Sequence, residues 1–319
     1  MKNYLLLFVF LPFIAIAQDV PAVADDVVVG DDGSDNKLRG IVLNAPELAY
    51  EHIEVAIDPP LVIETISSIA VDQAGNYYVI HRGEETDSIV VIDNAGQVLR
   101  TFGKGLFSRA HTIRLDGMGN VWTVDSTSSM VYKFSAEGVL LLEISVGNLP
   151  DPLEESCGAS DIAFADNGHV FISDGYCNAR IVEYDTAGQK QNEWGSPGNG
   201  PGEFNLPHAI SMSPDGNVYV ADRENGRIQW FTQNGDYLGE LHFGGRILSI
   251  TFSPSGNLFI GAEPKGAPPM QEGNILQLNP QSEEIIGKIP GFAHALEISD
   301  SGIILSGSLT EKITIYIPN

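Results

Sequence analysis

Three histidines of this chain recur at one position of a repeated pattern. His111, His208 and His294 each stand two residues before a segment that reads as strand, tight turn and strand, as in "IRLDGMGNVWTVD". Three imidazoles that meet at one point, with one side left open, suit a catalytic zinc or a similar divalent ion. The alternative is that each histidine is an ordinary polar residue at the start of a strand. The other histidines share no such position.

A tyrosine and two arginines are expected near the same place. Seven residues after the glycine of its turn, the first repeat carries Arg82 and the fourth carries Arg223, while Tyr176 comes one residue later in the third. The second strand runs antiparallel to the first, so its end returns to the face where the histidines stand. A phenol can transfer a proton and a guanidinium can bind a carboxylate. Surface ion pairs and packing are the alternatives for these residues.

Other recurring polar residues are interpreted as structural. An aspartate recurs at the end of the second strand in three repeats, and an arginine begins the third strand in two of them. These residues are Asp125, Asp174 and Asp222, and Arg180 and Arg227.

The elements that position these side chains follow from an internal repeat. Six copies of the strand–turn–strand pattern are spaced by 40 to 49 residues, which allows four short strands in each copy. Each turn contains a glycine of the kind that tight hairpins require. These glycines are Gly75, Gly119, Gly168, Gly216, Gly256 and Gly302. The pattern predicts an all-β fold, a six-bladed β-propeller of four-stranded antiparallel blades.

The propeller prediction also gives the geometry of the site. The strands before the turns should be the inner ones, and the three histidines fall in blades two, four and six, about 120° apart around the axis. Residues 52–57 and 312–317 are expected to share one blade and close the ring, which removes unpaired sheet edges.

The N-terminal residues predict a signal for export. Residues 1–17 combine a lysine, an apolar run and a small-x-small cleavage pattern. The run is short for a membrane span, although an uncleaved anchor is the alternative. Residues 18–50 are interpreted as an acidic flexible linker and residues 51–319 as the catalytic propeller. We therefore expect an exported protein, periplasmic or secreted, without a stable membrane span after cleavage of the signal.

Charge and cysteine content limit the partners and the compartment. The formal net charge is -25, which argues against nucleic acid or an anionic membrane as a partner. An exported chain with two cysteines, Cys157 and Cys177, favours a disulfide over free thiols. Both cysteines should lie on the rim that carries Tyr176, so a bond between them would hold that loop in place.

Two resemblances add to this interpretation. The stretch 198–231 resembles an NHL repeat. "HRG" at 81–83, "SDGYCNARI" at 173–181 and "ADRENGRIQ" at 221–229 resemble peptidyl-α-hydroxyglycine α-amidating lyases, the enzymes of the second step of peptide amidation. The resemblance covers roughly residues 50–319.

The family resemblance implies a fold and a set of roles. It implies a six-bladed propeller whose zinc is held by His111, His208 and His294. It also implies Tyr176 as the catalytic tyrosine, Arg82 and Arg223 as active-site arginines, and a Cys157–Cys177 disulfide. The reaction it implies cleaves the C–N bond of a peptidyl-α-hydroxyglycine to give a peptide amide and glyoxylate. The substrate would be a small molecule or peptide with a C-terminal carboxylate.

The chain also departs from the family pattern. The resemblance implies a structural calcium on the axis, bound partly by backbone carbonyls that map to Ile69 and Ile113. The family carries an aspartate directly after the third histidine, where this chain has Ala295, so calcium is in question here. No further cysteine exists for the family's second disulfide, and no copper monooxygenase domain is seen before the propeller.

Two alternative functions remain open at the level of sequence. The chain could be another metal-dependent propeller enzyme, such as a lactonase or a streptogramin-type lyase, although acidic residues usually surround the metal in those proteins. It could also be a non-catalytic NHL-type binding propeller, which would not need alternating histidines.

Overall fold

The computed structural model describes residues 34–147, 157–266 and 273–319. The predicted signal peptide, 1–17, lies outside the described residues. Within them, no helix is long and apolar enough to cross a membrane.

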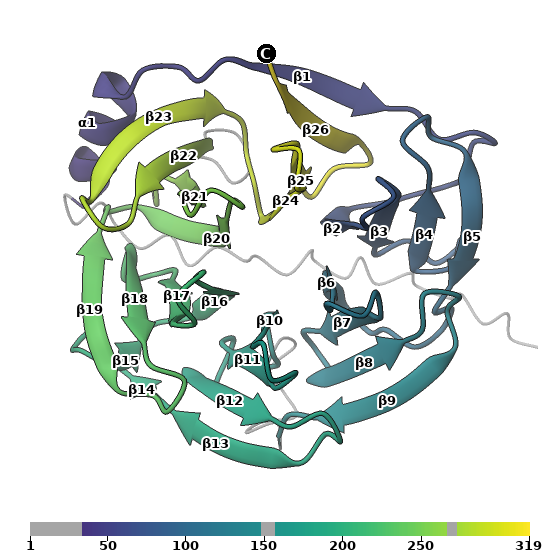
Figure 1. Ribbon diagram of the computed structural model, residues 1–319, viewed down its shortest axis with the longest axis horizontal. Helices are drawn as coiled ribbons and strands as arrows, with labels where there is room; N and C mark the ends of the chain where they lie inside the picture. The colour runs from purple at the N-terminus through teal and green to yellow at the C-terminus, as the bar shows by residue number, and fades with distance from the viewer. Residues whose placement is uncertain (1–33, 148–156, 267–272) are drawn as a thin grey trace, which may run out of the picture.

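The described residues form six four-stranded antiparallel sheets arranged as the blades of a ring, which confirms the predicted fold (Figure 1). The first three blades run outward from the axis in chain order. Blade one holds β2 (Ile66–Val71), β3 (Tyr77–His81), β4 (Ile89–Ile92) and β5 (Val98–Phe102). Blade two holds β6 (Ala110–Leu115), β7 (Val121–Asp125), β8 (Met130–Phe134) and β9 (Leu140–Ser145). Blade three holds β10 (Asp161–Phe164), β11 (Val170–Asp174), β12 (Arg180–Tyr184) and β13 (Lys190–Trp194).

The next two blades repeat this order, and a short parallel pair of strands precedes blade four. The pair is β14 (Ser196–Pro197) and β15 (Glu203–Phe204). Blade four holds β16 (Pro207–Met212), β17 (Val218–Asp222), β18 (Arg227–Phe231) and β19 (Tyr237–His242). Blade five holds β20 (Arg246–Phe252), β21 (Leu258–Glu263), β22 (Asn274–Asn279) and β23 (Glu284–Pro290).

Blade six closes the ring with strands from both ends of the described chain. It holds β24 (Ala295–Ile298), β25 (Ile304–Gly307) and β26 (Ile313–Pro318), and its outer strand is β1 (Tyr50–Val55). β1 pairs antiparallel with β26, from Tyr50 opposite Pro318 to Val55 opposite Ile313. The predicted pairing of residues 52–57 with 312–317 is therefore confirmed, with the strand ends shifted by one or two residues.

The turn glycines explain why the inner hairpins repeat so regularly. The glycine of each inner turn has a φ between 79° and 84°, in the left-handed region that an L side chain rarely adopts. In the first blade, Gly75 donates its N–H to the carbonyl of Asp72, and the Asp72 carboxylate accepts the N–H groups of Ala74 and Asn76. The short turn sets the register that returns β3 along β2.

The apolar core lies between neighbouring blades. Between blades two and three, for example, the fully buried side chains of Trp122, Val124, Ile162 and Ile172 form one cluster. Burying each such side chain contributes about 1.5–3 kcal/mol, so every blade depends on both of its neighbours. The ring is therefore rigid enough to hold polar groups at its axis.

The predicted flexible linker over 18–50 is wrong from Ser34 onward. Residues Ser34–Asn44 form the helix α1, the one α-helix among the described residues, and it packs beside blade five (Figure 1). Leu38 is 1% exposed within the core cluster of blades four and five. The Asp35 carboxylate accepts the N–H groups of Lys265 and Gly266 at 2.7 and 2.8 Å. Acidic composition concealed an apolar face in which Leu38, Ile41 and Val42 recur at helical spacing.

Candidate functional site: a three-histidine centre at the channel mouth

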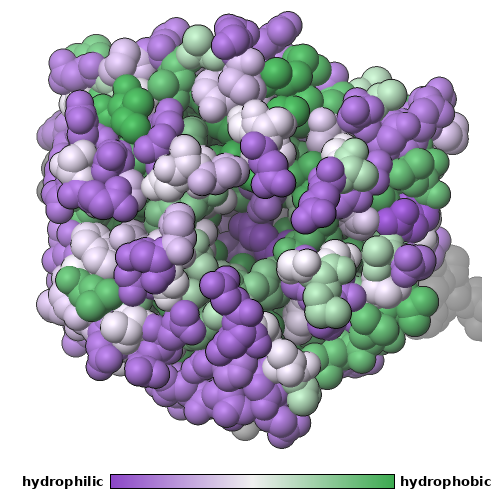
Figure 2. Space-filling model, viewed as in Figure 1, coloured by the Kyte–Doolittle hydropathy of each residue, from purple (hydrophilic) through white to green (hydrophobic). Residues whose placement is uncertain are grey.

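The three predicted histidines meet at one mouth of the central channel. The ligand nitrogens of His111, His208 and His294 lie within 4.8 Å of one another, and all three residues are buried. Their ring centroids are 4.7–5.1 Å apart in each pair. Figure 2 shows the ring hollowed at its centre, with hydrophilic residues on the floor of the hollow. The structure therefore confirms that alternate blades bring these imidazoles together.

One contact, repeated three times, orients the rings. The Nδ1 of His111 lies 2.6 Å from the carbonyl oxygen of Ser160. The Nδ1 of His208 lies 2.5 Å from that of Leu248, and the Nδ1 of His294 lies 3.0 Å from that of Ser67. Each acceptor occupies the same repeat position as the histidines, one blade further on. A carbonyl can only accept, so each Nδ1 carries the proton and each Nε2 presents a lone pair.

Two of the histidines are also held in the neutral form that a metal requires. Burial, followed by the charge of Arg82, lowers the pKa of His294 to about 3. Burial, followed by the neighbouring His294 and His208, lowers the pKa of His111 well below its usual range. Three buried imidazoles with Nε2 directed to one point are a donor set that fits Zn²⁺.

Tyr176 reaches into this group of histidines. Its hydroxyl oxygen lies 2.8 Å from Nε2 of His111 and 3.3 Å from Nε2 of His208. The main-chain N–H of Tyr176 donates to the carbonyl of Gly158. A phenol in this position can exchange a proton with a group bound at the point where the three Nε2 atoms converge.

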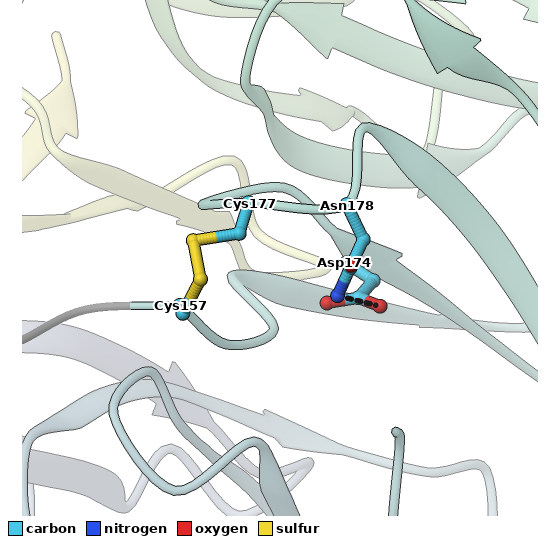
Figure 3. The surroundings of a disulfide bond; sticks show 4 residues. All are labelled: Cys157, Asp174, Cys177 and Asn178. Atoms are coloured by element: carbon cyan, nitrogen blue, oxygen red, sulfur yellow. Dashed lines mark hydrogen bonds between the residues drawn. A yellow bond between two sulfur atoms is a disulfide. The ribbon is translucent and has the colours of Figure 1, made fainter. Parts of the chain in front are cut away.

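A disulfide fixes the loop that carries the tyrosine. Cys157 and Cys177 are bonded, and Asn178, directly after the bridge, donates its side-chain N–H to the Asp174 carboxylate at 2.9 Å (Figure 3). The bridge and this hydrogen bond hold the chain on the C-terminal side of Tyr176. The predicted disulfide is therefore confirmed, and it is typical of an oxidising compartment.

Arginines supply positive charge around the histidines. Arg82 donates from Nε to the carbonyl of Ala110 at 3.1 Å, which places it beside His111. The charges of Arg82 and Arg223 both lower the pKa of His294, as expected for cations that lie near it. Beside Arg82 lies a cleft of about 300 Å³ whose lining includes Lys104 and Phe107. The site thus offers room and countercharge for an anionic ligand in a strongly acidic chain.

Some contributing residues were missed by the sequence analysis. The charge of Arg109 lowers the pKa of both His111 and His294. Arg109 stands two residues before His111, and Arg246 occupies the same repeat position in blade five. Both arginines lie two residues before the repeat position of the histidines, so the repeat pattern itself contains the signal for them.

Arg223 belongs to a chain of ion pairs with Glu224, Arg246 and Glu263. Its Nε lies 3.0 Å from Oε1 of Glu224, and Nε of Arg246 lies 3.2 Å from the same oxygen. Arg246 in turn lies 3.6 Å from Glu263. Glu224 is thus shared by two arginines, and no sequence motif indicated this.

The residues predicted to be structural have structural contacts. Asp174 and Asp222 pair with Arg180 and Arg227 at 2.8 and 2.7 Å. Asp125 accepts the N–H groups of two residues in the turn that follows it. These residues brace the loops of the rim, and they do not reach the histidines.

Comparison with known proteins agrees with this architecture. Residues 204–231 match the NHL repeat model. A streptogramin B lyase structure has a TM-score of 0.62 at 15% identity, covering 85% of this chain and 98% of that chain. A gluconolactonase-like structure has a TM-score of 0.63 at 12% identity, covering 87% and 95%. The chain is therefore a six-bladed propeller that contains an NHL repeat, and these structures show its fold alone.

The sequence relatives are more specific. Peptidyl-glycine alpha-amidating monooxygenase of Mus musculus is 33% identical in an alignment of 262 residues that covers 69% of this chain and 26% of the mouse protein. A probable peptidyl-alpha-hydroxyglycine alpha-amidating lyase of Caenorhabditis elegans is 33% identical in an alignment of 202 residues that covers 55% of this chain and 57% of the worm protein. The chain thus spans about a quarter of the mouse relative. Its resemblance to the peptidyl-α-hydroxyglycine α-amidating lyases is confirmed.

Proposed function

We propose that this protein is a zinc-dependent lyase that cleaves the C–N bond of a peptidyl-α-hydroxyglycine, releasing a peptide amide and glyoxylate. The observation that carries the proposal is the set of three Nδ1–H···O=C contacts. They leave three Nε2 atoms directed at one point beside a tyrosine hydroxyl. The named lyases among the sequence relatives support the choice of reaction.

The metal would be held by Nε2 of His111, His208 and His294. When bound, it would supply Lewis acidity toward the hydroxyl group of the substrate. The remaining chemistry belongs to side chains of this chain.

Arg82 and Arg223 would bind the substrate carboxylate, because guanidinium groups pair with carboxylates through charge-assisted hydrogen bonds. The cleft beside Arg82 gives the peptide portion a place to lie. The substrate hydroxyl then lies next to the Tyr176 oxygen. This arrangement favours a ligand with a carboxylate and a hydroxyl group on the same carbon.

Tyr176 would carry the proton. In its phenolate form it takes the hydroxyl proton, the C–N bond breaks as the carbonyl of glyoxylate forms, and the proton passes to the departing amide nitrogen. No water or redox partner is consumed, so atoms and electrons balance. The arginines stabilise the negative charge that persists on the carboxylate throughout.

Release of glyoxylate from α-hydroxyhippurate, with metal analysis of the purified protein, tests the proposal. We expect stoichiometric zinc and turnover. Tyr176→Phe should lower kcat by about 10²–10⁴-fold, the range for loss of a general acid–base group. The matched control is Tyr184→Phe, because the Tyr184 hydroxyl lies in the same blade but contacts only the carbonyl of Val146 in this structure. Zinc binding without glyoxylate release would refute the substrate, and full activity of Tyr176→Phe would refute the mechanism.

We also propose that the protein is exported, as its N-terminal residues predict. The Cys157–Cys177 disulfide supports this because such bonds persist mainly in oxidising compartments.

A further inference from the structure

Three charged side chains meet inside the channel, beyond the histidines. Arg114 of β6 lies 3.0 Å from the Asp161 carboxylate of β10 through Nη2, and 3.4 Å from the Glu297 carboxylate of β24 through Nη1. Blades two and six are separated by blade one, so the contact between Arg114 and Glu297 must span the channel. Arg114 is 8% exposed and Asp161 is 2% exposed.

The repeat places this cluster deeper than the histidines. Arg114 and Glu297 each follow the histidine of their own blade by three residues, about 10 Å further along the inner strand. Glu297 also lines two hollows formed by inner turns, which include Gly75 and Gly119 at the opposite mouth. The Arg114–Asp161–Glu297 cluster therefore lies in the channel between the histidine site and the far mouth.

The residues at this depth do not fit the calcium that the family resemblance implies. Calcium takes six to eight oxygen ligands from carboxylates, carbonyls and water. The expected aspartate is replaced by Ala295, and the carbonyl of Ile113 already accepts the Ser68 hydroxyl at 3.4 Å. Both nearby carboxylates face a guanidinium, whose charge would repel a divalent ion at close range.

We infer that the Arg114 guanidinium is the cation of the axial channel. It takes the place of a bound divalent ion in this propeller. Asp161 and Glu297 then form a divalent-cation site only when that guanidinium is removed.

The electrostatics of the cluster explain why a cation is needed there. Asp161 also accepts the N–H groups of Ile162 and Ile210, so its oxygens are fixed in place. Burial raises the pKa of Asp161, and the neighbouring Arg114 acts in the opposite direction. A buried carboxylate that loses its only cationic partner is strongly destabilising. A protein can meet this need with a metal ion or with a side chain, and here a side chain is present.

Calcium titration of the purified protein, with its own metal content left intact, tests the inference. For the wild-type chain, millimolar Ca²⁺ should leave Tm unchanged and give no binding heat in calorimetry. Arg114→Gln should lower Tm by roughly 5–10 °C, since two carboxylates lose their counter-ion. In that variant, Ca²⁺ should now bind and recover a substantial part of the lost Tm.

Three variants separate the cluster from general effects. Arg114→Lys keeps the charge, so it should stay nearer to wild type and remain insensitive to Ca²⁺. Arg114→Gln combined with Asp161→Asn should lose the Ca²⁺ response. Lys312→Gln removes an exposed ion pair with Glu54 and should change neither property. Calcium binding by the wild-type chain would overturn the inference, and this holds even if Arg114→Gln fails to fold. A folded Arg114→Gln chain that ignores Ca²⁺ would overturn it equally.

Discussion

The histidines of this site work in pairs with backbone carbonyls. Each even blade supplies an imidazole, and the blade that follows supplies the carbonyl that fixes the proton on Nδ1. The odd blades therefore need no histidine at this position, and they carry Ser67, Ser160 and Leu248 instead. Alternation of histidine and non-histidine blades is thus a requirement of the hydrogen bonding as well as of the metal geometry.

Neutral buried histidines make stability depend on pH. The pKa of His294 falls to about 3 in the folded chain, from an ordinary value of about 6.5 when unfolded. Below pH 6.5 the unfolded chain therefore binds protons that the folded chain does not, and stability is lost as the pH falls. For the chelator-treated protein, urea midpoints should be constant above about pH 7 and fall between about pH 6.5 and 5. His294→Gln should flatten this fall, and a wild-type profile that is level over the same range would contradict the prediction.

Glu224, which pairs with two arginines, should affect the affinity for the substrate. Glu224 pairs with both Arg223 and Arg246, so Arg246→Met leaves it to pair with Arg223 alone. Arg223 then has less charge to offer a substrate carboxylate. We expect KM to rise about tenfold, equivalent to about 1.4 kcal/mol, while kcat changes little. A fall in kcat at constant KM would contradict this role.

At the scale of elements, one arginine holds the loop between blades three and four. Arg227 is 1% exposed and pairs with Asp222 and Glu240, each at 2.7 Å. It also donates to the carbonyls of Asn199, Gly200 and Glu203. This loop leads directly into β16, which carries His208. The loop, the strand and His208 are therefore braced by a single side chain.

Two arginines at the same repeat position should differ in importance. Arg227→Met leaves the buried Asp222 carboxylate without its cationic partner, which costs about 3–5 kcal/mol of unfolding free energy. The side chain of Arg180 is 24% exposed, against 2% for Arg227, so water can enter where it stood beside the buried Asp174, and Arg180→Met should cost about 1–2 kcal/mol. Denaturant unfolding of both variants measures the difference. Equal losses would contradict the importance assigned to burial.

The elements show what sequence alone could and could not give. The inner hairpins, the closing blade and the repeat position of the histidines followed from turn glycines and strand periodicity, which are local signals. Helix α1 was missed because its few apolar residues stand in an acidic segment and find their partners in the core of blades four and five. The Arg114 cluster was missed because its contact with Glu297 joins two blades that are not neighbours. Contacts across the axis depend on side-chain reach, which a repeat alignment does not report.

At the scale of the whole molecule, net charge and site charge have opposite signs. The chain carries a formal charge of -25, while arginines surround the histidines. The interaction between exposed charges extends over a Debye length, which is about 30 Å at 0.01 M salt and about 8 Å at 0.15 M. Added salt should therefore weaken the long-range repulsion of an anionic substrate before it weakens the short-range arginine contacts.

The opposite signs of the net charge and the site charge predict how salt changes kcat/KM. For α-hydroxyhippurate, kcat/KM should rise about two- to threefold between low and physiological salt, because a distant like charge is screened first. A peptide substrate with added lysines should show the reverse trend. A monotonic fall for the anionic substrate would mean that the arginines dominate at all distances.

The pairing of β1 with β26 in blade six also affects the order in which the protein folds during synthesis. β1 leaves the ribosome some 260 residues before its partner β26. At about 5–20 residues per second, this separation is a delay of roughly 15–50 s. During that time β1 is a lone strand that could pair with a neighbouring nascent chain. The exposed carboxylates Glu51 and Glu54 place negative charge on both faces of this strand, which disfavours pairing with another copy. Since His294 arrives with the same late blade, the three-imidazole site becomes complete only when the ring closes.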